Sequence, residues 1–72
     1  MEIFKTKEEI DYWFETSEPG SVACYGIATE LRRPLNFMLQ HASEYYERNQ
    51  VQLFQKKQPN GSFHYLIRKA GK

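Results

Sequence analysis

The first pattern along the chain is a helix start followed by an apolar stripe. Thr6 opens a Thr-Lys-Glu-Glu run, a capping box in which the Thr hydroxyl and the Glu carboxylate accept from otherwise unpaired backbone N–H groups. Ile10, Trp13 and Phe14 follow at i, i+3 and i+4, which is the spacing of one helix face. The pattern predicts a helix over residues 6–16 that packs through Trp13.

A short apolar run and a second helical pattern follow. Residues 21–28 read Ser-Val-Ala-Cys-Tyr-Gly-Ile-Ala, which is typical of a buried strand bounded by turns. Pro34 lacks the N–H that a helix interior needs. The pattern therefore predicts a short helix over 29–33 and a longer helix over 35–49, with Phe37 outside its core face. That core face, at helical spacing, is expected to consist of Leu35, Met38, Leu39, Ala42, Tyr45 and Tyr46.

The C-terminal third alternates as two strands joined by a turn. Its apolar odd-numbered positions share one face only if odd positions pair with odd ones, which needs a loop of odd length. Pro59-Asn60-Gly61 supplies it, with Gly at the left-handed position of a three-residue hairpin connection. The sequence predicts strands over 51–57 and 62–69, with position 53 opposite position 67. The odd-numbered apolar positions are Val51, Leu53, Phe63, Tyr65 and Ile67.

The same register defines the other face of the hairpin, where apolar and basic side chains mix. If the core lies on the odd side, this even side is either solvated or a contact surface. Alternatively, Phe54 and Leu66 pack under the edge of a helix. The register places Gln52, Phe54 and Lys56 across from Arg68, Leu66 and His64.

Length and composition limit the class of protein. The chain has 72 residues, of which 40% are hydrophobic and 15% aromatic, so we expect one folded domain over residues 1–72 rather than a disordered chain. Cys24 is the only cysteine, which excludes an intrachain disulfide and favours a cytoplasmic location. The sequence contains no run of about 18 apolar residues, so we expect no membrane partner.

Charge is unevenly distributed although the net charge is only +1. Residues 1–20 hold six acidic residues and two lysines, whereas residues 51–72 hold five basic residues and no acidic one. A basic block of this kind marks a nucleic-acid or acidic-protein contact, or a hairpin kept soluble by its lysines and arginines. Charge alone does not separate these alternatives.

The sequence contains no recognisable motif for catalysis or for binding a metal or a cofactor. Two histidines and one cysteine are too few for a structural zinc site, and Cys24 lies in an apolar strand that favours an inert thiol. The four glycines are isolated, so the sequence has no glycine-rich phosphate loop. We therefore expect a non-enzymatic module that needs neither metal nor cofactor.

The order of predicted elements is helix, strand, short helix, longer helix and hairpin, which is an α+β arrangement. It resembles a winged helix-turn-helix domain over nearly the whole chain, with residues 56–62 as the wing. The Tyr-Tyr-Glu-Arg-Asn-Gln-Val-Gln-Leu-Phe-Gln-Lys-Lys segment is similar to small phage or prophage accessory proteins. The resemblance implies that the longer helix enters the major groove of duplex DNA and the wing contacts phosphate. Glu44 and Glu47 on that helix would be repelled by phosphate.

Two functions remain open. The first is a DNA-binding regulatory protein, for instance in transcription. Its expected contacts are Arg32, Arg33, Asn36, Gln40, His41, Lys56, Lys57, His64, Arg68 and Lys69. The second is a phage-type inhibitor or adaptor that docks on a protein target through Phe37, Phe54 and Leu66. Winged-helix proteins often dimerise, so a homodimer is also an expectation.

Overall fold

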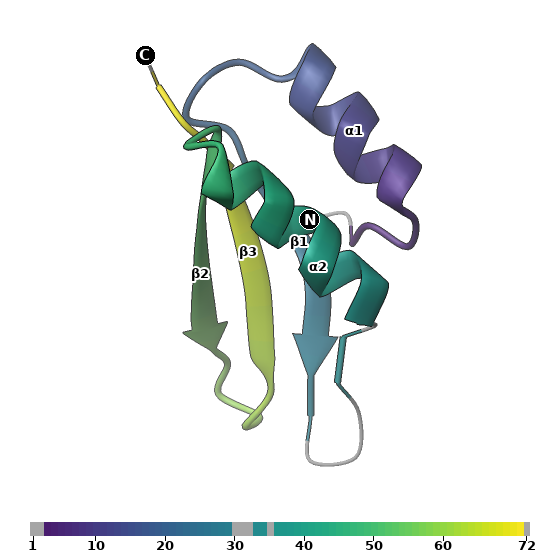
Figure 1. The fold of residues 1–72 in the computed structure, drawn as a ribbon. Coiled ribbons are helices and arrows are strands. Elements are labelled where there is room, and N and C mark those ends of the chain that lie inside the picture. Colours follow the sequence, from purple (N-terminus) through teal and green to yellow (C-terminus); the bar gives the residue numbers. More distant parts are fainter. Residues whose placement is uncertain (1–2, 30–32, 35, 72) are drawn as a thin grey trace.

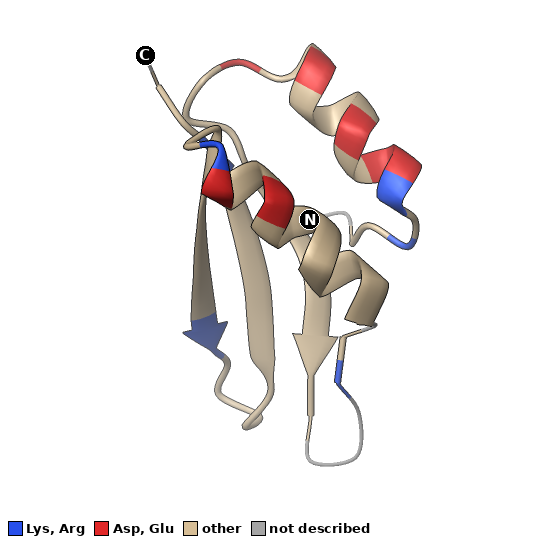
Figure 2. Cartoon of the chain, in the orientation of Figure 1, with Lys and Arg blue, Asp and Glu red and all other residues tan. Residues whose placement is uncertain are grey.

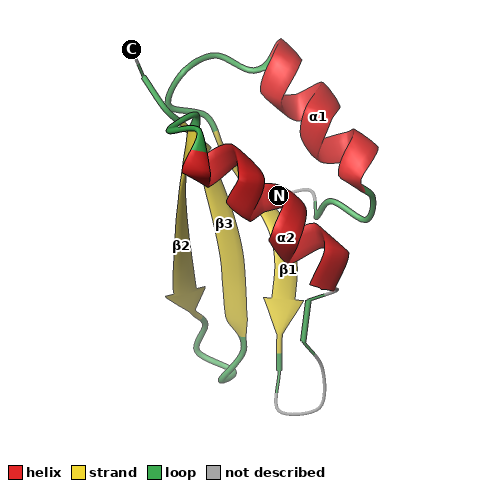
Figure 3. Cartoon of the chain, in the orientation of Figure 1, coloured by secondary structure: helices red, strands yellow, loops and turns green. Residues whose placement is uncertain are grey.

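A three-stranded antiparallel sheet carries both helices on one of its faces (Figure 1). The computed structural model describes residues 3–29, 33–34 and 36–71. The strand order is β1-β3-β2, so the last strand of the chain lies at the centre of the sheet (Figure 3). The predicted α+β class is confirmed. In chain order the elements are α1 (Lys7–Thr16), β1 (Val22–Ala28), α2 (Asn36–Glu47), β2 (Val51–Lys57) and β3 (Phe63–Lys69).

Helix α1 begins with the predicted capping box. The Thr6 hydroxyl accepts from the Glu9 N–H at 3.2 Å, and the Glu9 carboxylate accepts from the Thr6 N–H at 3.1 Å. Ile10 is the buried residue of this helix, at 0% exposure. Trp13 is only partly buried and stacks obliquely on Phe4, with ring centroids 6.0 Å apart. The anchor of α1 is therefore Ile10, one turn before the predicted Trp13.

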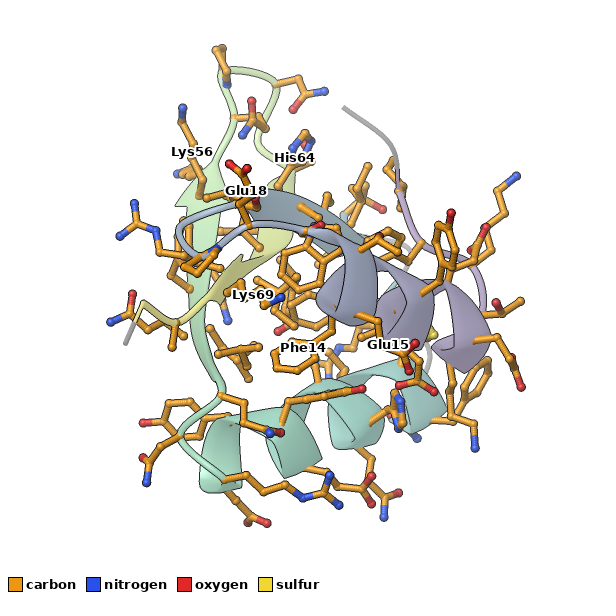
Figure 4. The ribbon with its side chains drawn as sticks, turned by 90° about the horizontal axis from the view of Figure 1, so that it is seen from above. Phe14, Glu15, Glu18, Lys56, His64 and Lys69 are labelled. Carbon is orange, nitrogen blue, oxygen red and sulfur yellow. The ribbon has the colours of Figure 1, made fainter. Side chains whose placement is uncertain are left out.

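A lysine from β3 closes the other end of α1. Lys69 Nζ donates to the carbonyl oxygens of Phe14 and Ser17, at 2.5 and 2.6 Å. It also lies 4.8 Å from the centre of the Phe14 ring, and Figure 4 shows the two side chains close together beside α1. A cation here satisfies carbonyls that the helix leaves unpaired and opposes the helix dipole. The last turn of α1 has no basic residue of its own, and Lys69 of β3 takes this position.

Helix α2 packs on the sheet through part of its predicted core face. Met38 and Ala42 are buried, while Leu39 and Tyr45 are partly buried against the same core. Tyr46 was expected there too, but it is 55% exposed. Tyr46 lies about 100° around the helix from Tyr45, at the edge of the face that contains Met38 and Ala42. Leu35 lies outside the described residues.

The hairpin has the predicted register and turn. Leu53 pairs with Ile67 and Phe54 with Leu66. In the loop, the Gln58 N–H donates to the Ser62 carbonyl at 2.7 Å, which leaves three residues between them. Gly61 has φ +91°, the left-handed conformation that a three-residue connection needs.

A bulge in β1 sets the direction of its side chains. Cys24 pairs with Leu66 and Gly26 with Tyr65, so Tyr25 is an extra residue in the strand. Tyr25 belongs to the core and meets the Tyr65 ring edge-on, with centroids 6.0 Å apart. Cys24 is fully buried, as expected for an inert apolar residue.

Gly26 allows the chain before α2 to cross close to β1. A Cβ at this position would lie 2.6 Å from Pro34 Cβ and 2.8 Å from Pro34 Cγ, which is closer than carbon atoms can approach. The predicted short helix over 29–33 falls largely outside the described residues. Its ends, Thr29 and Arg33, are not helical.

The core lies between the sheet and the helices. It joins residues of α1 and α2 to one side of the sheet, and Figure 1 shows α2 crossing in front of the strands. The opposite side of the sheet is consequently covered by neither helix. The buried residues of this core are Ile10, Ala23, Tyr25, Met38, Ala42, Val51 and Ile67.

Candidate functional site

The side of the sheet that points away from the helices combines residues from all three strands. Paired residues of antiparallel strands project to the same side, so the register defines its members. Leu66 lies at the centre, between Phe54 of β2 and Cys24 of β1. We call this surface the open sheet face. It consists of Val22, Cys24, Ile27, Gln52, Phe54, Lys56, His64, Leu66 and Arg68.

An exposed aromatic side chain stands on the β2 side of this face. Phe54 is 39% exposed and Val22 is 36% exposed, whereas Leu66 is only 6% exposed. The Arg68 guanidinium lies 6.0 Å from the centre of the Phe54 ring, the outer limit of a cation–π contact. Leu66, predicted as a docking residue, is thus mainly a support for its neighbours. Phe54 remains accessible to a ligand.

Basic side chains border the aromatic ring. Lys56 pairs with His64 across the two strands of the hairpin, and Figure 4 shows both side chains near its tip. Arg68 lies at the opposite end of the same face, across from Gln52. No acidic residue occurs in β1, β2 or β3. The face therefore offers a lysine, an arginine and an imidazole ring around an exposed phenyl group.

Acidic residues lie instead on the helices. The two helices carry one lysine, Lys7, no arginine and one histidine, His41. Figure 2 shows red segments along α1 and α2 and blue at the end of β2, with further blue at the start of α1 and directly after α2. An anionic ligand would thus be attracted to the sheet layer and repelled by the helical layer. The acidic residues of the helices are Glu8, Glu9, Asp11, Glu15, Glu44 and Glu47.

Two predicted contact residues are engaged within the fold. Lys69 caps α1, as described above. His41 Nε2 lies 2.7 Å from Asp11 Oδ1, and its Nδ1 lies 3.4 Å from Glu44 Oε1. Both side chains have partners far away in the sequence that local patterns do not reveal. Neither side chain belongs to the open sheet face.

The other predicted residues are dispersed. Asn36 and Gln40 are exposed on α2, and Arg33 is exposed before it, whereas Arg32 lies outside the described residues. Lys57 pairs with Phe63 and projects to the helix side of the hairpin. Only Lys56, His64 and Arg68 of the predicted basic set meet on the open sheet face. Phe37, predicted as a docking residue, is 45% exposed on α2 and belongs to a different surface.

Asp11 joins the two helices through a polar cluster. Its Oδ1 accepts a hydrogen bond of 2.7 Å from the Tyr45 hydroxyl and contacts His41 at the same distance. The bond from Tyr45, with further help from His41, lowers the pKa of Asp11 below its usual value of 3.8. Burial and the bond to Asp11 raise the pKa of Tyr45 to about 12. Burial likewise raises the pKa of Tyr25 to about 12.

Because the pKa values of Tyr25 and Tyr45 are raised, we expect the fold to lose stability at alkaline pH. A phenol whose pKa is raised by folding stabilises the fold below its ordinary pKa of 10.0, and this contribution disappears as pH rises toward about 12. The melting temperature should therefore fall less between about pH 9 and about pH 11 in Tyr45→Phe than in the unmodified chain. Circular dichroism melting measures this. Tyr12→Phe is the control, since Tyr12 is 71% exposed. Equal alkaline losses in all three chains would contradict the assignment.

The described part of the chain contains neither a metal-binding cluster nor a membrane-spanning helix. Within it, no group of three or more His, Cys, Asp or Glu side chains is arranged to hold a metal ion. Neither α1 nor α2 has the length and apolar character required to cross a membrane.

The comparisons with known proteins give no family. No protein-family model matches the chain, and no curated protein or solved structure matches it significantly.

The sequence did not predict that β1 contributes to the open sheet face. Val22 and Ile27 extend the apolar centre of the open sheet face beyond the hairpin. Simple alternation along β1 would place Cys24 and Gly26 on one side. The bulge at Tyr25 breaks that alternation. The only signal in the sequence was Gly26, because glycine inside a strand often accompanies a bulge or a close backbone approach.

Proposed function

We propose that the protein is a non-enzymatic nucleic-acid-binding module that uses its open sheet face. The observation that carries the proposal is the grouping of Lys56, His64 and Arg68 around the exposed Phe54, on a face without acidic residues. Basic side chains bind phosphates, and an exposed ring offers a stacking surface to any base. The acidic residues of the other layer orient the ligand toward the sheet.

The geometry favours single-stranded nucleic acid over duplex DNA. In the winged-helix resemblance, α2 would read the major groove, but its exposed side carries Glu44 and Glu47. His41, a predicted base contact of that helix, faces Asp11 instead. An open sheet face with an exposed aromatic ring suits bases that are already unstacked. Duplex DNA, which the resemblance implies, is the alternative ligand in the test.

The test is a binding titration with a labelled single strand of about 12 nucleotides, a length within the site sizes of known single-strand-binding domains, and with its duplex form. Fluorescence anisotropy should show tighter binding to the single strand. Phe54→Ala should weaken it by about 1–3 kcal/mol, the usual contribution of one stacked base. Phe37→Ala is the matched control, an exposed phenylalanine on α2. Binding to neither ligand, or equal losses in both variants, would contradict the proposal.

The exposed apolar residues of the same face favour protein docking as a second candidate. Val22 and Phe54 are both more than one third exposed, next to the partly buried Ile27. Buried apolar anchors carry most of the energy of protein interfaces, while charges at the rim mainly tune association rates. A protein partner would therefore depend on Val22 and Phe54 and respond weakly to salt. A nucleic acid would respond strongly to salt.

A further inference from the structure

A second surface, which uses no residue of the open sheet face, lies along α1. A groove of about 410 Å³ runs between this helix and the segment before it, a size within the range of ligand sites. Its lining combines three aromatic rings with two carboxylates and contains no basic side chain. The lining residues are Phe4, Glu8, Glu9, Tyr12, Trp13 and Thr16.

Folding does not account for all of these residues. Phe4 and Trp13 pack against the core, and Glu9 completes the capping box. Tyr12, however, is 71% exposed and is not among the residues packed against the core. No hydrogen bond or ion pair engages the Glu8 carboxylate within the described part of the chain. An exposed ring and an unpaired carboxylate therefore face the same groove.

The chemistry of the lining selects a cationic occupant. Aromatic faces attract ammonium and guanidinium groups through the ring quadrupole, at about 0.5–1 kcal/mol for each exposed contact. A neighbouring carboxylate adds a charged hydrogen bond to the same group. Anions are disfavoured by Glu8, Glu9 and the further acidic residues of α1. We infer that this groove binds an arginine or lysine side chain on a basic segment of a partner protein.

Trp13 makes occupancy of the groove directly measurable, because it is the only tryptophan of the chain. A capped tri-arginine peptide, titrated into the protein at low salt, should change the Trp13 fluorescence saturably. A capped tri-glutamine peptide should not. Tyr12→Ala should weaken the tri-arginine affinity by about threefold, the equivalent of one exposed cation–π contact, and Glu8→Gln should weaken it comparably. Retained circular dichroism would show that both variants fold.

Glu44→Gln is the matched control, since it removes the same charge from α2 outside the groove lining. It should leave the affinity unchanged. An unsaturable signal, or equal weakening in Glu44→Gln and Glu8→Gln, would overturn the inference in favour of nonspecific attraction. Self-association that disappears in Lys56→Glu with Lys57→Glu would also overturn it. The occupant would then be the basic hairpin of a second copy.

Discussion

Replacing Ile10 by alanine should destabilise the fold more than any other single truncation in α1. Ile10 is fully buried and joins α1 to the core that also contains Met38 and Ile67. Removing a buried isoleucine side chain costs about 2–5 kcal/mol through lost transfer free energy and the cavity left behind. Small domains have little stability to lose. Urea unfolding followed by circular dichroism should show much of the Ile10→Ala population unfolded without denaturant.

Two neighbouring truncations are controls for this result. Trp13→Ala should cost less than Ile10→Ala despite its larger side chain, because Trp13 is only partly buried. Tyr12→Ala should stay within about 0.5 kcal/mol of the parent, as exposed positions usually do. If Trp13→Ala proved the more damaging change, the assignment of Ile10 as the anchor of α1 would be wrong.

Reversing two charges on the open sheet face should largely abolish nucleic-acid binding. Lys56→Glu with Arg68→Glu replaces two cations beside Phe54, and both side chains are exposed, so the fold should persist. Each lost phosphate contact should flatten the slope of log affinity against log salt by about 0.7 for a single strand. The double variant should therefore lose about 1.4 of that slope. Anisotropy titrations over a salt series measure both quantities.

A second charge reversal separates this local effect from net charge. Lys5→Glu with Arg48→Glu makes the same change in net charge at exposed positions away from the open sheet face. It should weaken binding far less and retain the salt slope. Equal losses in the two double variants would show that binding follows overall charge alone. Binding that ignored Lys56→Glu with Arg68→Glu would remove the hairpin from the interface.

Local chemistry made several features predictable from the sequence. The capping box at Thr6 and the three-residue loop ending at Gly61 each depend on a few neighbouring residues, and both are present as predicted. The register that places Leu53 opposite Ile67 follows from loop length and alternation alone. The opposed pairs of the hairpin, including Lys56 with His64, follow from the same register.

Partnerships between distant residues were not predictable. Lys69 and Phe14 are 55 positions apart, and His41 and Asp11 are 30 positions apart. Their contacts depend on how α1 packs against α2 and the end of β3, which no local pattern encodes. For the same reason, basic composition alone could not distinguish Lys69, which holds a helix end, from Arg68, which faces outward. The bulge at Tyr25 also escaped prediction, and with it the share of β1 in the open sheet face.

Binding through the open sheet face fixes where a nucleic acid lies on the protein. Backbone amide chemical shifts can be followed by NMR while an unlabelled single strand of about 12 nucleotides is added at low salt. We expect the shifts to cluster on Gln52–Lys56 and His64–Arg68, with Val22 and Ile27 beside them on the same face. The outer side of α2, around Asn36 and Gln40, should remain unchanged. Shifts concentrated on α2, or spread evenly over the molecule, would contradict binding through the open sheet face.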